Sequence, residues 1–259
     1  MLLTAANASI RIDPARGGRV SAFTIAGLDL VVSEAPDPLE WGCYPMVPWA
    51  GRVREGRFSW KNRSFQLPLR RPPHAIHGTV LDRSWHALPE SQSLEVSLGD
   101  EWPWSATARS EFSMTEGRFD WKLTVSAKER PMPAMLGWHP WFRKHLADGS
   151  HSTLEFDADS MYVRDAAGIP TGARSSPPPG PWDDCFAGLH SPPRISWSNG
   201  MVLEVSSTCD HWVIYNQPEH AVCVEPQSGP PDAFNQGTGT AVRPGEPLVH
   251  TMTWRWWRA

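Results

Sequence analysis

The chain has 259 residues, of which 40% are apolar and 20% charged, a balance that is ordinary for globular proteins. This length suits one large domain or two small ones, and all-β sandwiches commonly run to about 200–250 residues as one domain. The 24 Lys and Arg against 28 Asp and Glu give a net charge of −4, which argues against the basic surface of a nucleic-acid-binding protein.

The cysteines and the N-terminus narrow the class further. Cys43, Cys185, Cys209 and Cys223 are scattered without a CxxC pair, so they indicate neither a metal site nor a disulfide framework. The opening MLLTAANASIRI lacks the basic region and apolar core of a signal peptide. No window of roughly 18 apolar residues predicts a transmembrane helix. We therefore expect a cytoplasmic protein with no membrane partner.

Alternating apolar and polar residues predict antiparallel strands along much of the chain. The clearest is 118–126, RFDWKLTVS, where Phe119, Trp121, Leu123 and Val125 fall on one face. Similar patterns cover 93–98, 106–114, 201–207, 211–215 and 249–256, with turn signals such as TEG, SNG and NQP between strands. No amphipathic helix of three turns is visible. The sequence thus predicts an all-β fold, a large antiparallel β-sandwich or barrel.

Two further features of composition bear on this fold. Most of the 15 tryptophans are expected to fill the core of the sandwich, although a Trp face also stacks well on a sugar. The SSPPPGP run at 175–181 reads as a surface loop, because the strand pattern continues after it at similar density. We therefore expect one domain over residues 1–259.

Two segments in the first third of the chain place polar groups among prolines and apolar residues. In CYPMVPWAGRVREGRFSW (43–60), Arg52 and Arg54 are two apart, so they would share a face of an extended chain. Arg52 could bind a carboxylate or sugar hydroxyls, or it could lie on a solvated edge strand. In PPHAIHGTVLDRSWH (72–86), His77 precedes Gly78, and His74 lies three residues earlier. A metal pair would need a third ligand, and none has a diagnostic spacing.

Three later segments supply an imidazole and carboxylates. His139 lies in the aromatic run MLGWHPWF (135–142), where its ordinary pKa near 6.5 suits proton transfer at neutral pH. PWDDCF (181–186) offers Asp183 and Asp184. In AVCVEPQSGPPDAF (221–234), Glu225 follows an apolar run and precedes Pro226, at what reads as a strand end, and such a carboxylate tends to have a raised pKa. Asp232 in the same stretch reads as a turn former.

Taken together, these segments resemble a known family. YPMVPWAGRVREGRF, HAIHGTV, GWHPWF, WDDCF and VCVEPQSGPPDAFN occur in the order and approximate spacing of aldose 1-epimerases, the galactose mutarotase family. The N-terminal ARGGRVSAFTIAGLDLVV (15–32) is similar to that family's opening strands. The resemblance implies the large β-sandwich of galactose mutarotases, the supersandwich, with a cleft for a monosaccharide. It implies no cofactor and no metal, and either a monomer or a homodimer.

The resemblance also implies roles for individual residues in an isomerase of carbohydrate metabolism. Glu225 matches the general base that takes the proton of the anomeric hydroxyl, and His139 matches the general acid at the ring oxygen. His77 matches the second active-site histidine, and the choice of acid between the two histidines stays open. Arg52 matches the arginine that contacts the sugar, and Asp183, or its neighbour Asp184, matches the substrate-binding acid.

Other functions are compatible with the same residues. A catalytically silent sugar-binding or regulatory domain would have this fold without turnover. A phosphorylated-sugar 1-epimerase would bind the phosphate through Arg54, Arg57 or Arg71. A carbohydrate-cleaving enzyme would use Glu225 with an aspartate as a carboxylate pair. Thr79, which follows Gly78 where many family members carry a second glycine, leaves the preferred aldose open.

Overall fold

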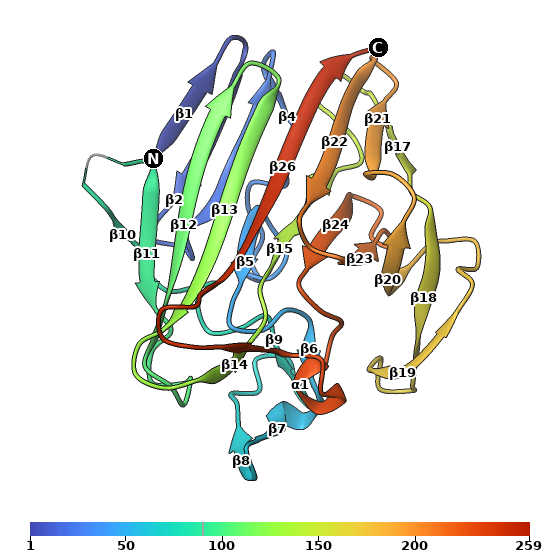
Figure 1. Cartoon of the computed structure of the whole chain (residues 1–259). Coiled ribbons are helices and arrows are strands. Elements are labelled where there is room, and N and C mark those ends of the chain that lie inside the picture. Colours follow the sequence, from blue (N-terminus) through green and yellow to red (C-terminus); the bar gives the residue numbers. More distant parts are fainter. Residues whose placement is uncertain (90) are drawn as a thin grey trace.

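The structure is a computed structural model that describes residues 1–89 and 91–259. Two large antiparallel sheets lie against each other, with smaller two-stranded ladders at one end (Figure 1). The chain is thus all-β, as predicted, with the sheets of a sandwich.

The first sheet has twelve strands, in the order β1-β2-β3-β5-β15-β24-β23-β20-β18-β19, with β4 on β3 and β16 on β24. Its strands are β1 (Leu2–Ala5), β2 (Ala8–Asp13), β3 (Arg19–Ile25), β4 (Leu28–Asp29), β5 (Cys43–Met46), β15 (Gly137–Pro140), β16 (Phe142–Arg143), β18 (Ala158–Arg164), β19 (Pro170–Ser175), β20 (Asp183–Leu189), β23 (His211–Tyr215) and β24 (Ala221–Gln227).

The second sheet has eight strands, in the order β10-β11-β12-β13-β26-β22-β21-β17. Its strands are β10 (His86–Ala87), β11 (Ser93–Ser97), β12 (Ala106–Thr115), β13 (Arg118–Ala127), β17 (Ser152–Glu155), β21 (Arg194–Trp197), β22 (Met201–Ser207) and β26 (Leu248–Arg258). The small ladders pair β6 (Arg52–Val53) with β9 (Ala75–Ile76), β7 (Arg57–Trp60) with β8 (Arg63–Gln66), and β14 (Met132–Ala134) with β25 (Thr240–Val242).

Helical structure in the described residues is limited to the 3₁₀ turn η1 (Arg54–Gly56) and the short helix α1 (Ala233–Gln236). Within those same residues, no helix has the length and apolar character needed to cross a membrane.

Each strand predicted from alternation is present. In β13, Phe119, Trp121, Leu123 and Val125 are fully buried, as expected for the inner face of a half-buried strand. Tryptophan fills much of the interior, since all but Trp60, Trp182 and Trp257 are buried.

The register of three central strands decides which polar residues lie together. β20, β23 and β24 are paired so that Asp183 lies opposite Tyr215, and Cys185 opposite Val213. Val213 in turn lies opposite Glu225. Because residues two apart in a strand share a face, Asp183 and Glu225 lie on the same side of the sheet.

One feature of β24 differs from the sequence expectation. Glu225 does not end the strand, because β24 continues through Pro226 to Gln227. Pro226 lies opposite Trp212 of β23, and Gln227 lies opposite Gly137 of β15. Pro226 cannot donate a ladder hydrogen bond, yet the pairing with β23 continues on both sides of it, at Glu225 and at Gln227. Glu225 is therefore held within the sheet.

Candidate active site

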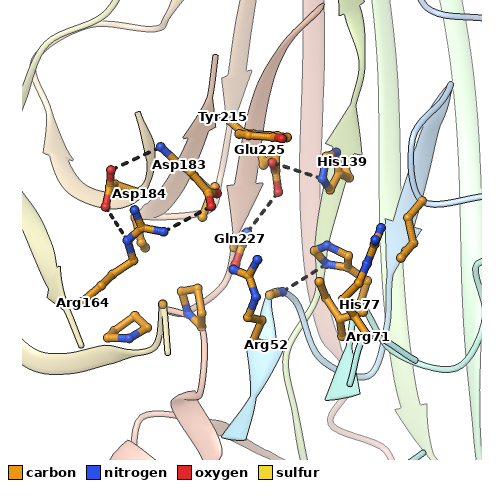
Figure 2. A pocket seen from close by; sticks show the side chains of 18 of the residues that line it. Arg52, Arg71, His77, His139, Arg164, Asp183, Asp184, Tyr215, Glu225 and Gln227 are labelled. Atoms are coloured by element: carbon orange, nitrogen blue, oxygen red, sulfur yellow. Dashed lines mark hydrogen bonds and ion pairs between the residues drawn. The ribbon is translucent and has the colours of Figure 1, made fainter. Parts of the chain in front are cut away.

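One cavity of about 280 Å³ opens on this face of the first sheet (Figure 2). Its lining includes the five residues expected from the sequence, namely Arg52, His77, His139, Asp183 and Glu225. These residues come from β6, the segment after β9, β15, β20 and β24. Residues up to 173 positions apart in the chain, Arg52 and Glu225, thus line one site.

Glu225 and His139 are in contact at the base of this cavity. The His139 Nε2 and Glu225 Oε1 atoms are 3.3 Å apart, and both side chains are almost fully buried. The Gln227 amide lies 3.5 Å from the other carboxylate oxygen of Glu225 (Figure 2). In the described residues, no lysine or arginine forms an ion pair with Glu225.

Burial favours the neutral form of both groups in this pair. Desolvation raises the pKa of Glu225 well above its ordinary value, Asp183 raises it further, and Arg52 opposes the shift. Desolvation lowers the pKa of His139 to about 3. The contact is therefore better described as a carboxyl group beside a neutral imidazole than as an ion pair.

Aromatic rings fix the plane of the His139 imidazole. It stacks between Tyr44, at 5.0 Å between ring centroids, and Trp141, at 5.2 Å and 9° between planes. The Tyr44 hydroxyl and the Trp141 indole N–H both donate to the Leu39 carbonyl, at 3.0 and 2.9 Å. One backbone oxygen thus fixes both rings that enclose the imidazole.

His77 has a defined backbone and a defined ring. Its φ is +56°, and its Nδ1 accepts a hydrogen bond from the Gly51 N–H at 3.3 Å. Desolvation, with a smaller effect of His139, lowers the pKa of His77 well below its ordinary value. A neutral imidazole whose Nδ1 accepts carries its proton on Nε2, so His77 is a hydrogen-bond donor toward the cavity. Gly78 is required next, because a Cβ there would overlap the Val47 carbonyl.

Arg52 and Asp183 are the two ionisable side chains whose charges influence the pKa of Glu225. No carboxylate of the described residues forms an ion pair with the Arg52 guanidinium, which leaves its donors for a ligand. Arg164 lies 3.2 Å from Asp183 and 2.7 Å from Asp184 and orients both acids. Desolvation raises the pKa of Asp183 although Arg52 and Arg164 oppose it. Of the two acids, Asp183 shares the face of Glu225.

Other expected residues lie outside this constellation. Arg54 does not share a cavity-facing strand with Arg52, because the chain turns into η1 after Val53; its guanidinium binds Asp165 at 2.6 Å. His74 accepts the Glu55 N–H at 3.1 Å and does not line the cavity with His77.

Asp232 adopts the left-handed conformation expected of a turn former. It accepts the Arg54 N–H at 2.9 Å and the Asn235 amide at 2.7 Å, which agrees with a structural role.

A family model described as aldose 1-epimerase matches residues 4–185, more than half of the chain. The chain belongs to the aldose 1-epimerase family. Glu225 and Gln227 lie beyond the residues matched by the family model. Their position in the cavity of this family member is known from the structure, in which β24 pairs with β23. Two curated relatives from Escherichia coli match at 23% identity. The uncharacterized protein YihR covers 85% of this chain and 81% of its own length, and the uncharacterized protein YphB covers 82% and 83%.

Solved structures share the fold of this epimerase-family chain. A galactose mutarotase-like protein from Clostridium acetobutylicum superposes with a TM-score of 0.89 at 15% identity, covering 100% of this chain and 95% of its own. A putative aldose 1-epimerase from Escherichia coli gives 0.86 at 20% identity, covering 100% and 98%. Galactose 1-epimerase from Lactobacillus acidophilus gives 0.81 at 16% identity, covering 99% and 93%. The fold is therefore that of galactose mutarotase-like proteins.

Several residues of the epimerase-family cavity were not expected from the sequence. Gln227 lies two positions from Glu225 on the same face of β24, and that spacing could have identified it. Trp141 lies two positions from His139, just beyond the end of β15. Arg164 and Tyr215 carry no such signal, because strand pairing alone brings them to the cavity.

Proposed function

We propose that this chain is an aldose 1-epimerase that interconverts the α and β anomers of a free monosaccharide by general acid–base catalysis. The observation that carries the proposal is the convergence of Arg52, His77, His139, Asp183 and Glu225 on one cavity, with the Glu225 carboxyl group against the His139 ring. The cavity volume of about 280 Å³ is just below the roughly 300–1,000 Å³ of drug-sized small-molecule sites, which suits a single sugar ring.

The reaction needs one proton to leave the anomeric oxygen and another to reach the ring oxygen. Glu225 takes the proton of the anomeric hydroxyl, and a carboxylate whose pKa is raised is a better base for this step. In the reacting complex the one acidic proton of the Glu225–His139 pair lies on His139, which leaves Glu225 as the carboxylate base. The His139 imidazolium gives this proton to the ring oxygen as the C1–O5 bond breaks and an aldehyde forms. Rotation about C1–C2 and reclosure with the two roles exchanged give the other anomer and restore both groups.

The remaining residues bind and orient the sugar in this proposal. The Nε2–H of His77 donates to a sugar oxygen near the reacting bond, because its Nδ1 is already engaged by Gly51. Arg52, beside His77, donates to hydroxyl groups of the sugar, and Asp183, oriented by Arg164, accepts from them. Holding both oxygens between fixed groups removes much of the entropic cost of the reaction.

The test is anomer exchange measured by NMR over a panel of aldoses. We expect acceleration above buffer for at least one aldose, and a fall of roughly 10²–10⁴-fold in the Glu225→Gln variant, which keeps the shape of the side chain but cannot act as a base. Glu219→Gln, the same change at an exposed position, is the matched control and should keep the full rate. Equal rates in the two variants would contradict the role of Glu225.

The same panel separates the alternatives. Sugar binding by calorimetry with no exchange would indicate a silent binding domain. For a phosphorylated sugar, only Arg71 of the three candidate arginines lines the cavity, and it pairs with Asp37 at 2.9 Å and Glu40 at 3.6 Å. The free sugar therefore has more support.

A further inference from the structure

Three different metal-ligand atoms meet beside the cavity. One ligand atom each from His139, Cys223 and Glu225 lies within 4.8 Å of the other two, and all three side chains are buried. Cys223 and Glu225 are two apart in β24 and share its face, while His139 comes from β15. Nitrogen, thiolate sulfur and carboxylate oxygen are the ligand types that Zn²⁺ binds in proteins.

The distances suit a tetrahedral cation. Zinc bonds of about 2.0–2.1 Å to nitrogen and oxygen place two such ligands about 3.3–3.4 Å apart, and His139 Nε2 and Glu225 Oε1 are separated by 3.3 Å. The sulfur needs a bond of about 2.3 Å, so in this proposal the cluster, whose three ligand atoms lie within 4.8 Å of one another, closes around the cation when it binds. Glu225 and His139 line the cavity, which supplies a route of entry and room for a fourth ligand such as water.

A second observation points to a cation at this place. Glu225 is 2% exposed, yet in the part of the chain that the structure describes no lysine or arginine pairs with it, and its partners are the His139 ring at 3.3 Å and the Gln227 amide at 3.5 Å. Buried carboxylates are ordinarily paired with a cation or bound to a metal.

We propose that His139, Cys223 and Glu225 bind one thiophilic divalent cation, with Zn²⁺ as the test case, and that the bound cation excludes the sugar. On binding, the Cys223 thiol, and the Glu225 carboxyl group where it is protonated, release their protons to solvent, while His139 binds as the neutral imidazole. Mg²⁺ and Ca²⁺ prefer all-oxygen ligand sets and are not expected to bind. The exclusion of sugar rests on the proposed function, whereas the metal site itself does not.

Binding of Co²⁺ can be measured by absorption, so the metal site can be tested without an activity assay. Titration of the chain with Co²⁺ should show one equivalent bound, with the sulfur-to-cobalt charge-transfer absorption of a thiolate ligand. Cys223→Ser should lose this absorption, and its Zn²⁺ affinity, measured by calorimetry, should fall at least about 10-fold. Cys185→Ser is the matched control, since Cys185 lines the same cavity and should keep the absorption.

Cys223→Ala provides a second variant of apolar character in case serine is not tolerated in the core. The proposal is overturned if the wild-type chain shows no sulfur-to-cobalt absorption, or if the absorption persists without the Cys223 sulfur.

Inhibition by Zn²⁺ then tests the second part of the proposal, that the bound cation excludes the sugar. Zn²⁺ should slow anomer exchange in competition with the sugar, and each variant is compared with its own rate in the absence of metal. If the chain accelerates anomer exchange but shows no cobalt absorption, the metal site is overturned and the proposed function stands. A chain that binds cobalt through Cys223 but exchanges no aldose would overturn the proposed function alone. Zinc binding that leaves the exchange rate unchanged would overturn the exclusion of sugar.

Discussion

Arg19 is a fully buried arginine without a carboxylate partner in the described residues, and it supports the segment that carries Leu39. Its guanidinium donates to the carbonyls of Pro38, Trp41 and Leu81 at 2.9–3.0 Å and stacks on the Trp41 ring at 4.0 Å. Burial lowers its pKa to about 10, so the group stays charged at neutral pH. Backbone carbonyls thus bind the buried guanidinium where a carboxylate would ordinarily do so. The segments that carry these carbonyls are held together by the Arg19 side chain.

Replacing Arg19 should therefore be costly. Arg19→Met removes the donors to the buried carbonyls of Trp41 and Leu81 and to the partly exposed carbonyl of Pro38. Because each unsatisfied buried group costs about 1–3 kcal/mol, we expect a loss of about 2 kcal/mol or more. Arg19→Lys should also destabilise the chain, since an ammonium cannot reproduce the planar fork. Urea unfolding measures both. Arg16→Met, which removes an exposed arginine, is the control and should change stability by less than about 1 kcal/mol; a similar loss in both methionine variants would contradict this role of Arg19.

At the scale of elements, sequence patterns predicted strands well where one face is buried and the other is not. β12, β13 and β26 alternate because they cover the core with one face only. β24 does not alternate, since all of Ala221–Gln227 is buried. Its apolar run followed by Glu225 and Pro226 therefore reads as a strand end in the sequence, although the strand continues to Gln227. An alternating sequence pattern cannot predict a strand such as β24, whose polar residues are buried because they line a cavity.

The identities of the candidate residues were recoverable from short motifs, but their proximity was not. Nothing in GWHPWF or VCVEPQ indicates that His139 and Glu225 touch, because that contact depends on which strands pair and in which register. For the same reason, the sequence alone did not identify Cys223 as a candidate metal ligand. Cys223 is one of four scattered cysteines in the sequence, and only the fold brings it to a histidine and a glutamate.

Near the β19 edge of the first sheet, a histidine that follows β20 contacts two aspartates at the start of β18. His190, directly after β20, places its Nδ1 2.8 Å from Asp157 and its Nε2 2.7 Å from Asp159 of β18. The hydrogen bond to Asp159, followed by that to Asp157, raises the pKa of His190. The contact favours the charged ring, so its stabilisation is fully present below the ordinary pKa near 6.5 and is lost as the pH rises through the raised value.

NMR titration of the His190 ring checks this sign. We expect a midpoint above 6.5 in the folded chain, and a lower midpoint in Asp159→Asn, because that change removes one of the two charges. Asp148→Asn, at an exposed aspartate whose carboxylate binds Asn199, serves as the control and should leave the His190 titration unchanged. A midpoint at or below 6.5 in the unmodified chain would show that the two carboxylates do not favour the charged ring.

At the scale of the whole molecule, the cavity lies on one sheet, yet its walls depend on the packing between both sheets. Trp254 of β26 makes ring contacts with Phe23 of β3 and Phe142 of β16 at 5.3 and 5.1 Å, and with Phe119 of β13 at 5.3 Å. It therefore joins the eight-stranded sheet to the twelve-stranded one within a single apolar core. A chain built in this way should unfold as one unit, and the sequence prediction of one domain over residues 1–259 requires the same behaviour.

Trp254→Ala tests that cooperativity. Removing a fully buried Trp typically costs about 3–5 kcal/mol, and because this ring contacts both sheets, the whole chain should lose stability together. Far-UV circular dichroism, near-UV circular dichroism and anomer exchange should decline in one coincident transition, at a lower urea concentration than in the unmodified chain. Trp257→Ala, which removes a 40% exposed ring from the same strand, should move that transition far less. Two separated transitions would indicate that the sheets fold independently, and the cavity would then depend on the stability of the twelve-stranded sheet alone.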